Sequence, residues 1–193
     1  MSDALRDPEE LTKYEPYLRM LARVKMRRAY QAKLGASDIV QQTLLQAVQA
    51  IDDFRGGTDA ELRGWLRQIL ARNIAHLDRD MHRDKRDVRR ERSIEERLQQ
   101  SSMRLEGWLA GAGPTPSQHA VAGEHVLHLA SAIERLPEGQ RDAVRMHYLE
   151  GRKLSEVASQ LDKSTSAVAG LLHRGMKSLR SELASLTGNR SSP

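Results

Sequence analysis

Few residues in this sequence have the types and spacing that catalysis or metal binding requires. His125 and His128 stand at a helical i,i+3 spacing beside Glu124, but no further acid lies at a matching spacing to complete a metal site. The chain has no cysteine, which excludes disulfides, thiolate zinc sites and thiol catalysis. Since it also has no glycine-rich phosphate loop or nucleophile elbow, we expect no enzymatic activity, no metal and no cofactor.

The segment from Leu149 to Arg180 has the residue pattern of a helix-turn-helix, a motif that binds rather than catalyses. Apolar residues recur at i, i+3, i+4 and i+7 between Leu154 and Leu161, which predicts one buried helical face. Asp162 tolerates the left-handed conformation of a tight turn, and Ser164 is a good N-cap for a second helix.

The free face of that second helix is expected to be basic and hydroxylic. Residues 163–180 include four Lys/Arg and no acid. This composition after a short turn suits the major groove of DNA, whereas a helical hairpin with a solvated face is the alternative that spacing alone leaves open. The residues expected on this face are Ser164, Thr165, Ser166, Ala169, Gly170, His173, Arg174 and Lys177.

Composition predicts an all-α protein with a polyanionic partner. The 193 residues carry a net charge of +5, and aromatic residues make up only 4%. Alternating β-branched patterns are almost absent, while Ala, Leu, Arg, Gln and Glu dominate. No run approaches the ~18 apolar residues of a membrane span, and the acidic N-terminus does not resemble a signal peptide, so we expect a cytoplasmic protein without membrane contact.

Helical periodicity and the positions of helix-breaking residues divide the chain into two small helical domains. We expect an N-terminal domain over 1–95, a flexible linker rich in Gly, Pro and Ser over 96–123, and a C-terminal domain over 124–193 that contains the helix-turn-helix. Ser37 or Asp38 is expected to cap the second helix of the N-terminal domain. The expected helices cover residues 11–33, 38–51, 60–92, 121–136 and 140–149, followed by the helix-turn-helix.

The order of these parts resembles a known family. The motifs are DIVQQT, DDFRG and LRGWLRQILARNIA in the first half, then IERLPEGQRDAV, LEG and LLHRGMKSLR in the second. Together they resemble bacterial RNA polymerase sigma factors, specifically the extracytoplasmic-function (ECF) type, over about residues 11–93 and 124–184. The resemblance implies a subunit that binds core RNA polymerase and directs promoter recognition, −10 melting and transcription initiation.

The resemblance also implies three sets of contact residues. The partners would be the clamp of the largest polymerase subunit, the flap region and promoter DNA; an anti-sigma factor is left open. The polymerase set is Asp38, Gln41, Gln42, Leu45, Gln46, Asp52 and Asp53. The −10 set is Arg55, Arg63, Trp65, Arg67, Arg72, Asn73 and Arg79, and the −35 set is the helix face given above.

Some positions depart from the family pattern. Primary sigma factors have two adjacent aromatics where this chain has Gly64-Trp65, and the usual ECF asparagine stands one position before Asn73. Trp65 is equally consistent with core packing. A stand-alone helix-turn-helix regulator and an all-α adaptor remain alternatives, and the sequence names neither the promoter, the inducing signal nor the organism. It also leaves open whether the two domains pack together in the free protein.

Overall fold

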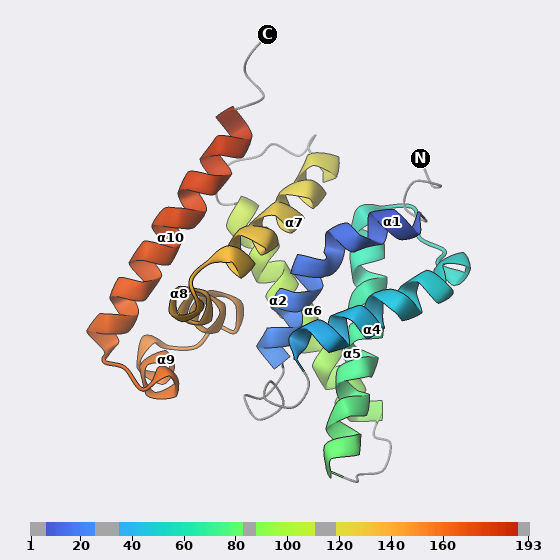
Figure 1. Cartoon of the computed structure of the whole chain (residues 1–193), viewed down its shortest axis with the longest axis horizontal. Coiled ribbons are helices and arrows are strands. Elements are labelled where there is room, and N and C mark those ends of the chain that lie inside the picture. The colour runs from blue at the N-terminus through green and yellow to red at the C-terminus, as the bar shows by residue number, and fades with distance from the viewer. Residues whose placement is uncertain (1–6, 26–34, 83–87, 111–118, 189–193) are drawn as a thin grey trace.

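A computed structural model describes residues 7–25, 35–82, 88–110 and 119–188, and every regular element in these ranges is helical. The predicted all-α class is therefore confirmed. In Figure 1, α2 and α7 lie in the centre, α4 and α5 on one side, and α8, α9 and α10 on the other. None of the described helices is long and apolar enough to cross a membrane.

The N-terminal half is built around three helices whose apolar faces meet. Leu18 and Leu21 from one helix, Val40 from the next and Leu66 and Leu70 from the third are completely buried. Pro16 stands in the first turn of its helix, where no backbone N–H is needed. The elements are α1 (Pro8–Leu11), η2 (Thr12–Tyr14), α2 (Glu15–Lys25), α4 (Ala36–Gln49), η3 (Ile51–Asp53) and α5 (Asp59–His82).

The start of α4 lies two residues before the predicted one. Gly35 is the N-cap, with φ −64° and ψ 152°. The backbone N–H of Gly35 donates to Oδ2 of Asp38 at 2.9 Å. The expected cap at Ser37 or Asp38 is therefore wrong in register, because the Asp38 carboxylate acts from inside the first turn, as the third residue of a capping box does.

The stretch predicted to start a flexible linker is instead helical. α6 (Val88–Ala110) is a continuous helix, and Ile94, Leu98 and Leu105 along it are buried. The single helix predicted over 60–92 is also wrong, because Arg79 of α5 pairs with Glu91 of α6 at 2.9 Å, whereas one continuous helix would hold these residues about 18 Å apart. Residues 83–87 and 111–118 lie outside the described ranges. The linker was predicted from a cluster of Gly, Pro and Ser residues that includes Ser101 and Ser102, and the hydroxyls of these two buried serines have partners far along the chain.

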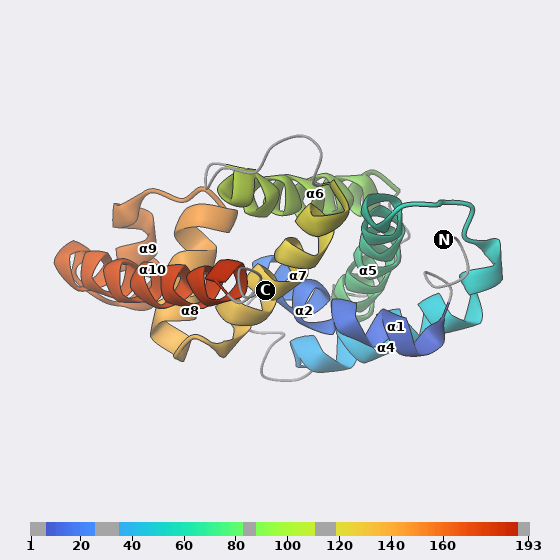
Figure 2. The ribbon, with the colours of Figure 1, turned by 90° about the horizontal axis from the view of Figure 1, so that it is seen from above.

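The C-terminal half is a compact group of helices with the predicted helix-turn-helix at its end. The elements are α7 (His119–Arg135), α8 (Glu138–Val144), the π-helical turn η5 (Arg145–Leu149), α9 (Leu154–Leu161) and α10 (Thr165–Gly188). The buried apolar residues of both halves form one cluster, which includes side chains from α2, α6 and α7. Seen from above in Figure 2, α6 runs along one side of the molecule from beside α5 toward α8 and α9.

Candidate nucleic-acid interface

The turn between α9 and α10 has the geometry that the sequence predicted. Asp162 adopts a left-handed conformation with φ 53°, the only positive φ outside glycine among the described residues. The backbone N–H of Lys163 closes the turn on the carbonyl of Ala158 at 3.0 Å. Ser164 Oγ then accepts from the N–H of Ala167 at 3.1 Å, which caps α10 as expected.

The outer face of α10 is exposed and carries positive charge. Val168, Leu172 and Leu179 are buried on the inner face, as predicted. Gly170 is half-buried, and a Cβ built on it would lie 3.4 Å from Nη1 of Arg174, so the Arg174 guanidinium lies back over Gly170. The exposed candidates are Ser164, Thr165, Ser166, Ala169, His173, Arg174 and Lys177.

A close approach to α8 sets the position of α10. Gly175 is buried, and a Cβ added there would lie 3.0 Å from Cγ2 of Val144, 3.6 Å from Cβ of Gln140 and 3.7 Å from Cδ1 of Leu136. The absence of a side chain therefore lets the two helices pack closely. This contact holds the outer face at a fixed angle to the rest of the domain.

The loop before α5 is ordered by a capping box that the sequence analysis did not identify. Oε2 of Glu61 accepts from the N–H of Gly57 at 2.9 Å, from the N–H of Thr58 at 3.0 Å and from Thr58 Oγ1 at 2.9 Å. The N–H of Glu61 donates back to Thr58 Oγ1 at 3.2 Å. The backbone hydrogen bond from Gly57 is the main cause that lowers the pKa of Glu61. The signal was present in the sequence as Thr58-x-x-Glu61.

Aromatic packing fixes the other side of this loop. Phe54 is buried, and its ring lies 5.4 Å from that of half-buried Trp65, centroid to centroid. A Cβ on Gly56 would lie 2.4 Å from Cζ of Phe54, so only glycine fits there. Trp65 thus has the core-packing role that the sequence left open, although part of its surface remains accessible.

The seven candidate −10 residues do not share one exposed surface. Arg55 and Arg72 are exposed, although Nη1 of Arg55 also donates to the carbonyl of Asp52 at 3.2 Å. Asn73 is only 7% exposed, and its Nδ2 donates to Thr43 Oγ1 at 3.0 Å, which joins α5 to α4. Arg79 is half-buried and pairs with Glu91 at 2.9 Å.

Arg63 and Arg67 are also held by other parts of the protein. Arg63 is 5% exposed and forms an ion pair with Asp59, while its Nη2 lies 3.6 Å from Oε1 of Glu106. Asp59 also accepts a hydrogen bond from the hydroxyl of Tyr14. Burial raises the pKa of Tyr14 to about 12, although the positive charge of Arg63 acts to lower it. Nη1 of Arg67 donates to the hydroxyl of Tyr17 at 2.8 Å.

The polymerase candidates do form a surface on α4. Gln41, Gln42 and Leu45 are exposed and Gln46 is half-buried, so they line one side of the helix. Leu45 is 59% exposed, one of two large apolar side chains so exposed among the described residues. Asp38, Asp52 and Asp53 are exposed at the two ends of this surface. No group of three or more His, Asp or Glu in the described ranges could hold a metal.

Comparisons with known proteins match both halves of the chain. Residues 13–86 match the family described as Sigma-70 region 2, and residues 127–179 match Sigma-70, region 4. The first match covers α2, α4 and α5, and the second covers about half of α7, then α8, η5, α9 and most of α10. The candidate surfaces above therefore lie within the two matched regions.

Individual relatives cover most of the chain. It is 31% identical over 142 residues to the RNA polymerase sigma factor CnrH of Cupriavidus metallidurans, which covers 74% of this chain and 70% of the relative. It is 26% identical over 181 residues to the ECF RNA polymerase sigma factor SigD of Mycobacterium tuberculosis, 94% of this chain and 77% of the relative. The chain therefore belongs to the ECF group of RNA polymerase sigma factors, which bind core polymerase and promoter DNA and direct transcription initiation.

Proposed function

We propose that the two halves of this sigma factor divide the promoter between them, with the C-terminal half reading the −35 element as duplex DNA. The observation that carries this proposal is the exposed outer face of α10, which is cationic and directly follows a left-handed turn. The hydroxyls of Thr165 and Ser166 lie at the helix N-terminus, where they would meet base edges. Arg174 and Lys177 lie further along and would contact phosphates.

The N-terminal half would open the −10 element and hold its non-template strand. The ordered loop before α5 would capture an extruded base, and a preformed pocket repays part of the few kcal/mol that base extrusion costs. Exposed Arg55 and Arg72 are the residues best placed for the first contacts with the strand. Arg63, Arg67, Asn73 and Arg79 would act from within the protein, by holding α5 in place, unless their present partners release them.

The exposed face of α4 would dock on the clamp of the largest polymerase subunit. An uncharged surface that contains Leu45 is unsuited to DNA but suited to a protein partner, with Asp52 and Asp53 at its edge. The C-terminal half would contact the flap region. A protein that covered either the α4 face or the α10 face would act as an anti-sigma factor. Such a sigma factor would work in the cytoplasm.

Two substitutions that introduce a negative charge test the DNA-binding and the polymerase-binding assignments separately. Arg174→Glu should weaken binding to −35 duplex and reduce the slope of log K against log salt by about one for each lost phosphate contact. The same variant should bind core polymerase as the wild type does. Leu45→Glu should do the reverse, because it places a charge in a protein interface.

The assay is binding to purified core polymerase, followed by transcription from a genomic promoter library. New start sites downstream of a shared −35 and −10 pair would support the proposal and identify the promoter. Binding to DNA without any association with core polymerase would contradict it and favour a stand-alone regulator. Equal loss of both activities in each variant would contradict the division between the halves.

A further inference from the structure

The first helix of the helix-turn-helix, α9, is held in place by few apolar side chains. Only Val157 and Ala158 of its eight residues are buried, and Leu154 and Leu161 at its two ends are half-buried. The hydrophobic effect is non-directional, because it depends on the apolar area removed from water. The orientation of α9 within the C-terminal half therefore needs a further determinant.

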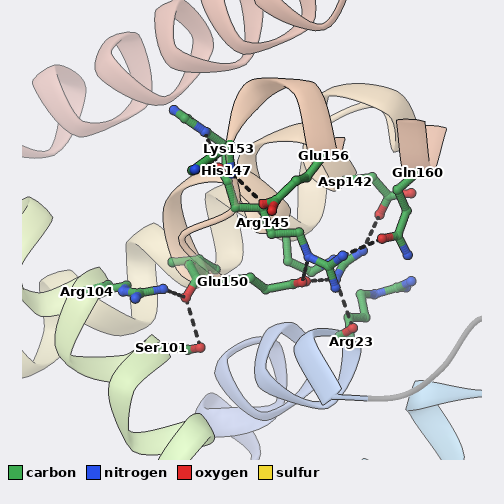
Figure 3. A network of polar contacts seen from close by, with 12 residues as sticks. Arg23, Ser101, Arg104, Asp142, Arg145, His147, Glu150, Lys153, Glu156 and Gln160 are labelled. Atoms are coloured by element: carbon green, nitrogen blue, oxygen red, sulfur yellow. Dashed lines mark hydrogen bonds and ion pairs between the residues drawn. The ribbon is translucent and has the colours of Figure 1, made fainter. Parts of the chain in front are cut away.

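A chain of polar contacts provides this determinant. Nε of Arg152, in the loop before α9, donates to Oε2 of Glu150 at 2.6 Å, and its Nη1 donates to Oε1 of Gln160 near the C-terminal end of α9. The other carboxylate oxygen of Glu150 pairs with Arg145 of η5, and Oδ1 of Asp142 in α8 lies 3.5 Å from Nη2 of the same arginine (Figure 3). We call these five residues the polar strut, which joins the C-terminal end of α9 to α8.

Arg152 is the member of the polar strut that contacts α9, and its backbone is also fixed. Its N–H donates to the carbonyl of Met146 at 3.0 Å, and its carbonyl accepts from Nδ1 of His147 at 2.8 Å. Both partners belong to η5, so the backbone from which the Arg152 side chain extends is bound to η5. Because a guanidinium carries its donors in a rigid planar fork, this one side chain can bridge Glu150 and Gln160 at defined angles.

The orientation of α9 determines where the N-terminal end of α10 lies. The middle of α10 packs against α8 at Gly175. Its first turn begins at Thr165, after the left-handed residue Asp162, and the N–H of Lys163 ties this connection to the carbonyl of Ala158 in α9. A rotation of α9 would therefore shift the first turn of α10, whereas binding contacts require placement to within about 0.5 Å.

We propose that Arg152 is a positioning residue for promoter recognition, which acts through α9 to set the approach of α10 to the bases of the −35 element. The proposal rests on the proposed reading of that element by α10. The competing explanation is a phosphate contact, because the first helix of this motif crosses the DNA backbone and Arg152 is only half-buried. A phosphate contact needs a positive charge, whereas the polar strut needs a fork that reaches two partners.

The substitution Arg152→Lys separates these roles, because it keeps the charge and removes the fork. The full chain in complex with core polymerase is titrated with two duplexes of equal length, one with the −35 sequence found in the promoter library and one with that sequence scrambled. The affinity for the −35 duplex relative to the scrambled duplex should fall roughly three- to tenfold, a modest change because a partly exposed ion pair contributes little.

Two further quantities should stay the same in Arg152→Lys. These are the affinity for the scrambled duplex and the slope of log K against log salt, because the number of positive charges near the DNA is unchanged. An unchanged preference for the −35 duplex, or an equal loss of affinity for both duplexes, would overturn the proposal. The titrations are made well below the melting temperature of each variant, so that a loss of stability alone does not alter the preference.

A second substitution tests whether the polar strut acts as a unit. Gln160→Ala removes the partner on α9 and should lower the same preference, and the double variant with Arg152→Lys should lose no more than the weaker single variant. Additive losses would contradict the polar strut. The matched control is Arg135→Lys, which makes the same change in the ion pair with Glu182 and should leave the preference intact. An equal loss in this control would also contradict a specific role of Arg152.

The position of α9 can be measured without DNA. The chain has no cysteine, so Glu138→Cys and Ser159→Cys place two spin labels at exposed sites on α8 and α9. Electron paramagnetic resonance should give one narrow distribution of label distances, and Arg152→Lys should broaden it while the helical circular dichroism is preserved. Identical distributions would overturn the proposal. If the wild type shows no preference for the −35 duplex, the proposed function fails instead, and the label distances still report whether Arg152 fixes α9.

Discussion

The substitution Asn73→Ala separates a structural role of this residue from a role in reading DNA. The resemblance to sigma factors placed Asn73 among the −10 contacts, but the residue is only 7% exposed and its Nδ2 donates to Thr43 Oγ1 at 3.0 Å. Thr43 Oγ1 in turn donates to the carbonyl of Ile39 within α4 at 2.7 Å, so the hydroxyl accepts from α5 and donates within α4. The contact therefore connects α5 to the middle of α4.

The expected loss follows from this geometry. One buried hydrogen bond contributes about 1 kcal/mol net, and the cavity left by the amide adds to this, so the free energy of unfolding should fall by about 1–3 kcal/mol. For a chain of this size, a loss of about 2 kcal/mol corresponds to roughly 4–8 °C in Tm. A double-mutant cycle with Thr43→Val should return a coupling energy of about 1 kcal/mol.

Urea denaturation and thermal melts measure this loss, and the neighbouring exposed residue is the control. Arg72→Ala should leave the free energy of unfolding within about 0.5 kcal/mol, because surface changes rarely cost more. In promoter-opening assays below both melting temperatures, Arg72→Ala should reduce −10 melting and Asn73→Ala should leave it nearly intact. If Asn73→Ala has wild-type stability but no longer opens the −10 element, the reasoning is refuted and Asn73 contacts DNA instead.

Two other predictions concern the elements that position the candidate surfaces. Gly175→Val should destabilise the C-terminal half by about 1–3 kcal/mol through overpacking against Val144, measured by urea denaturation, and a wild-type midpoint would contradict the close approach of α10 to α8. Hydrogen bonds from Gly57 and Thr58 lower the pKa of Glu61 in the folded state. The stabilisation of the loop by the Glu61 carboxylate is therefore fully present at neutral pH, and it should be lost only as pH falls below the ordinary glutamate range. The amide resonances of Gly57 and Thr58 should therefore titrate there, and in Glu61→Gln this titration should disappear.

The helix-turn-helix could be predicted from the sequence because its determinants are local. The apolar spacing from Leu154 to Leu161, a turn residue that tolerates positive φ and a serine N-cap all act within a few residues of one another. The buried positions Val168, Leu172 and Leu179 followed from helical periodicity in the same way. The exposure of Gln41, Gln42 and Leu45 on α4 was likewise consistent with the apolar stripe on its other face.

The character of residues 96–110 could not be predicted in this way. The linker was predicted from clustered Gly, Pro and Ser residues, and the serines among them, Ser101 and Ser102, occupy buried positions of α6 whose hydrogen-bond partners the sequence does not reveal. The partners are the carbonyl of Leu149 and the hydroxyl of Tyr17, which lie 48 and 85 residues away along the chain. Only the folded chain brings them together.

The arginines and the asparagine of α5 show the same contrast between local signals and distant partners. The sequence by itself determined that the protein is helical, that it ends in a DNA-binding motif and that its parts follow the order of an ECF sigma factor. The tertiary structure alone decided that Arg63 and Asn73 face protein partners rather than solvent, and that α6 joins the two halves. The physical reason is that helix propensity and capping depend on neighbours within one or two turns, whereas the burial of a polar group depends on distant residues that satisfy its hydrogen bonds.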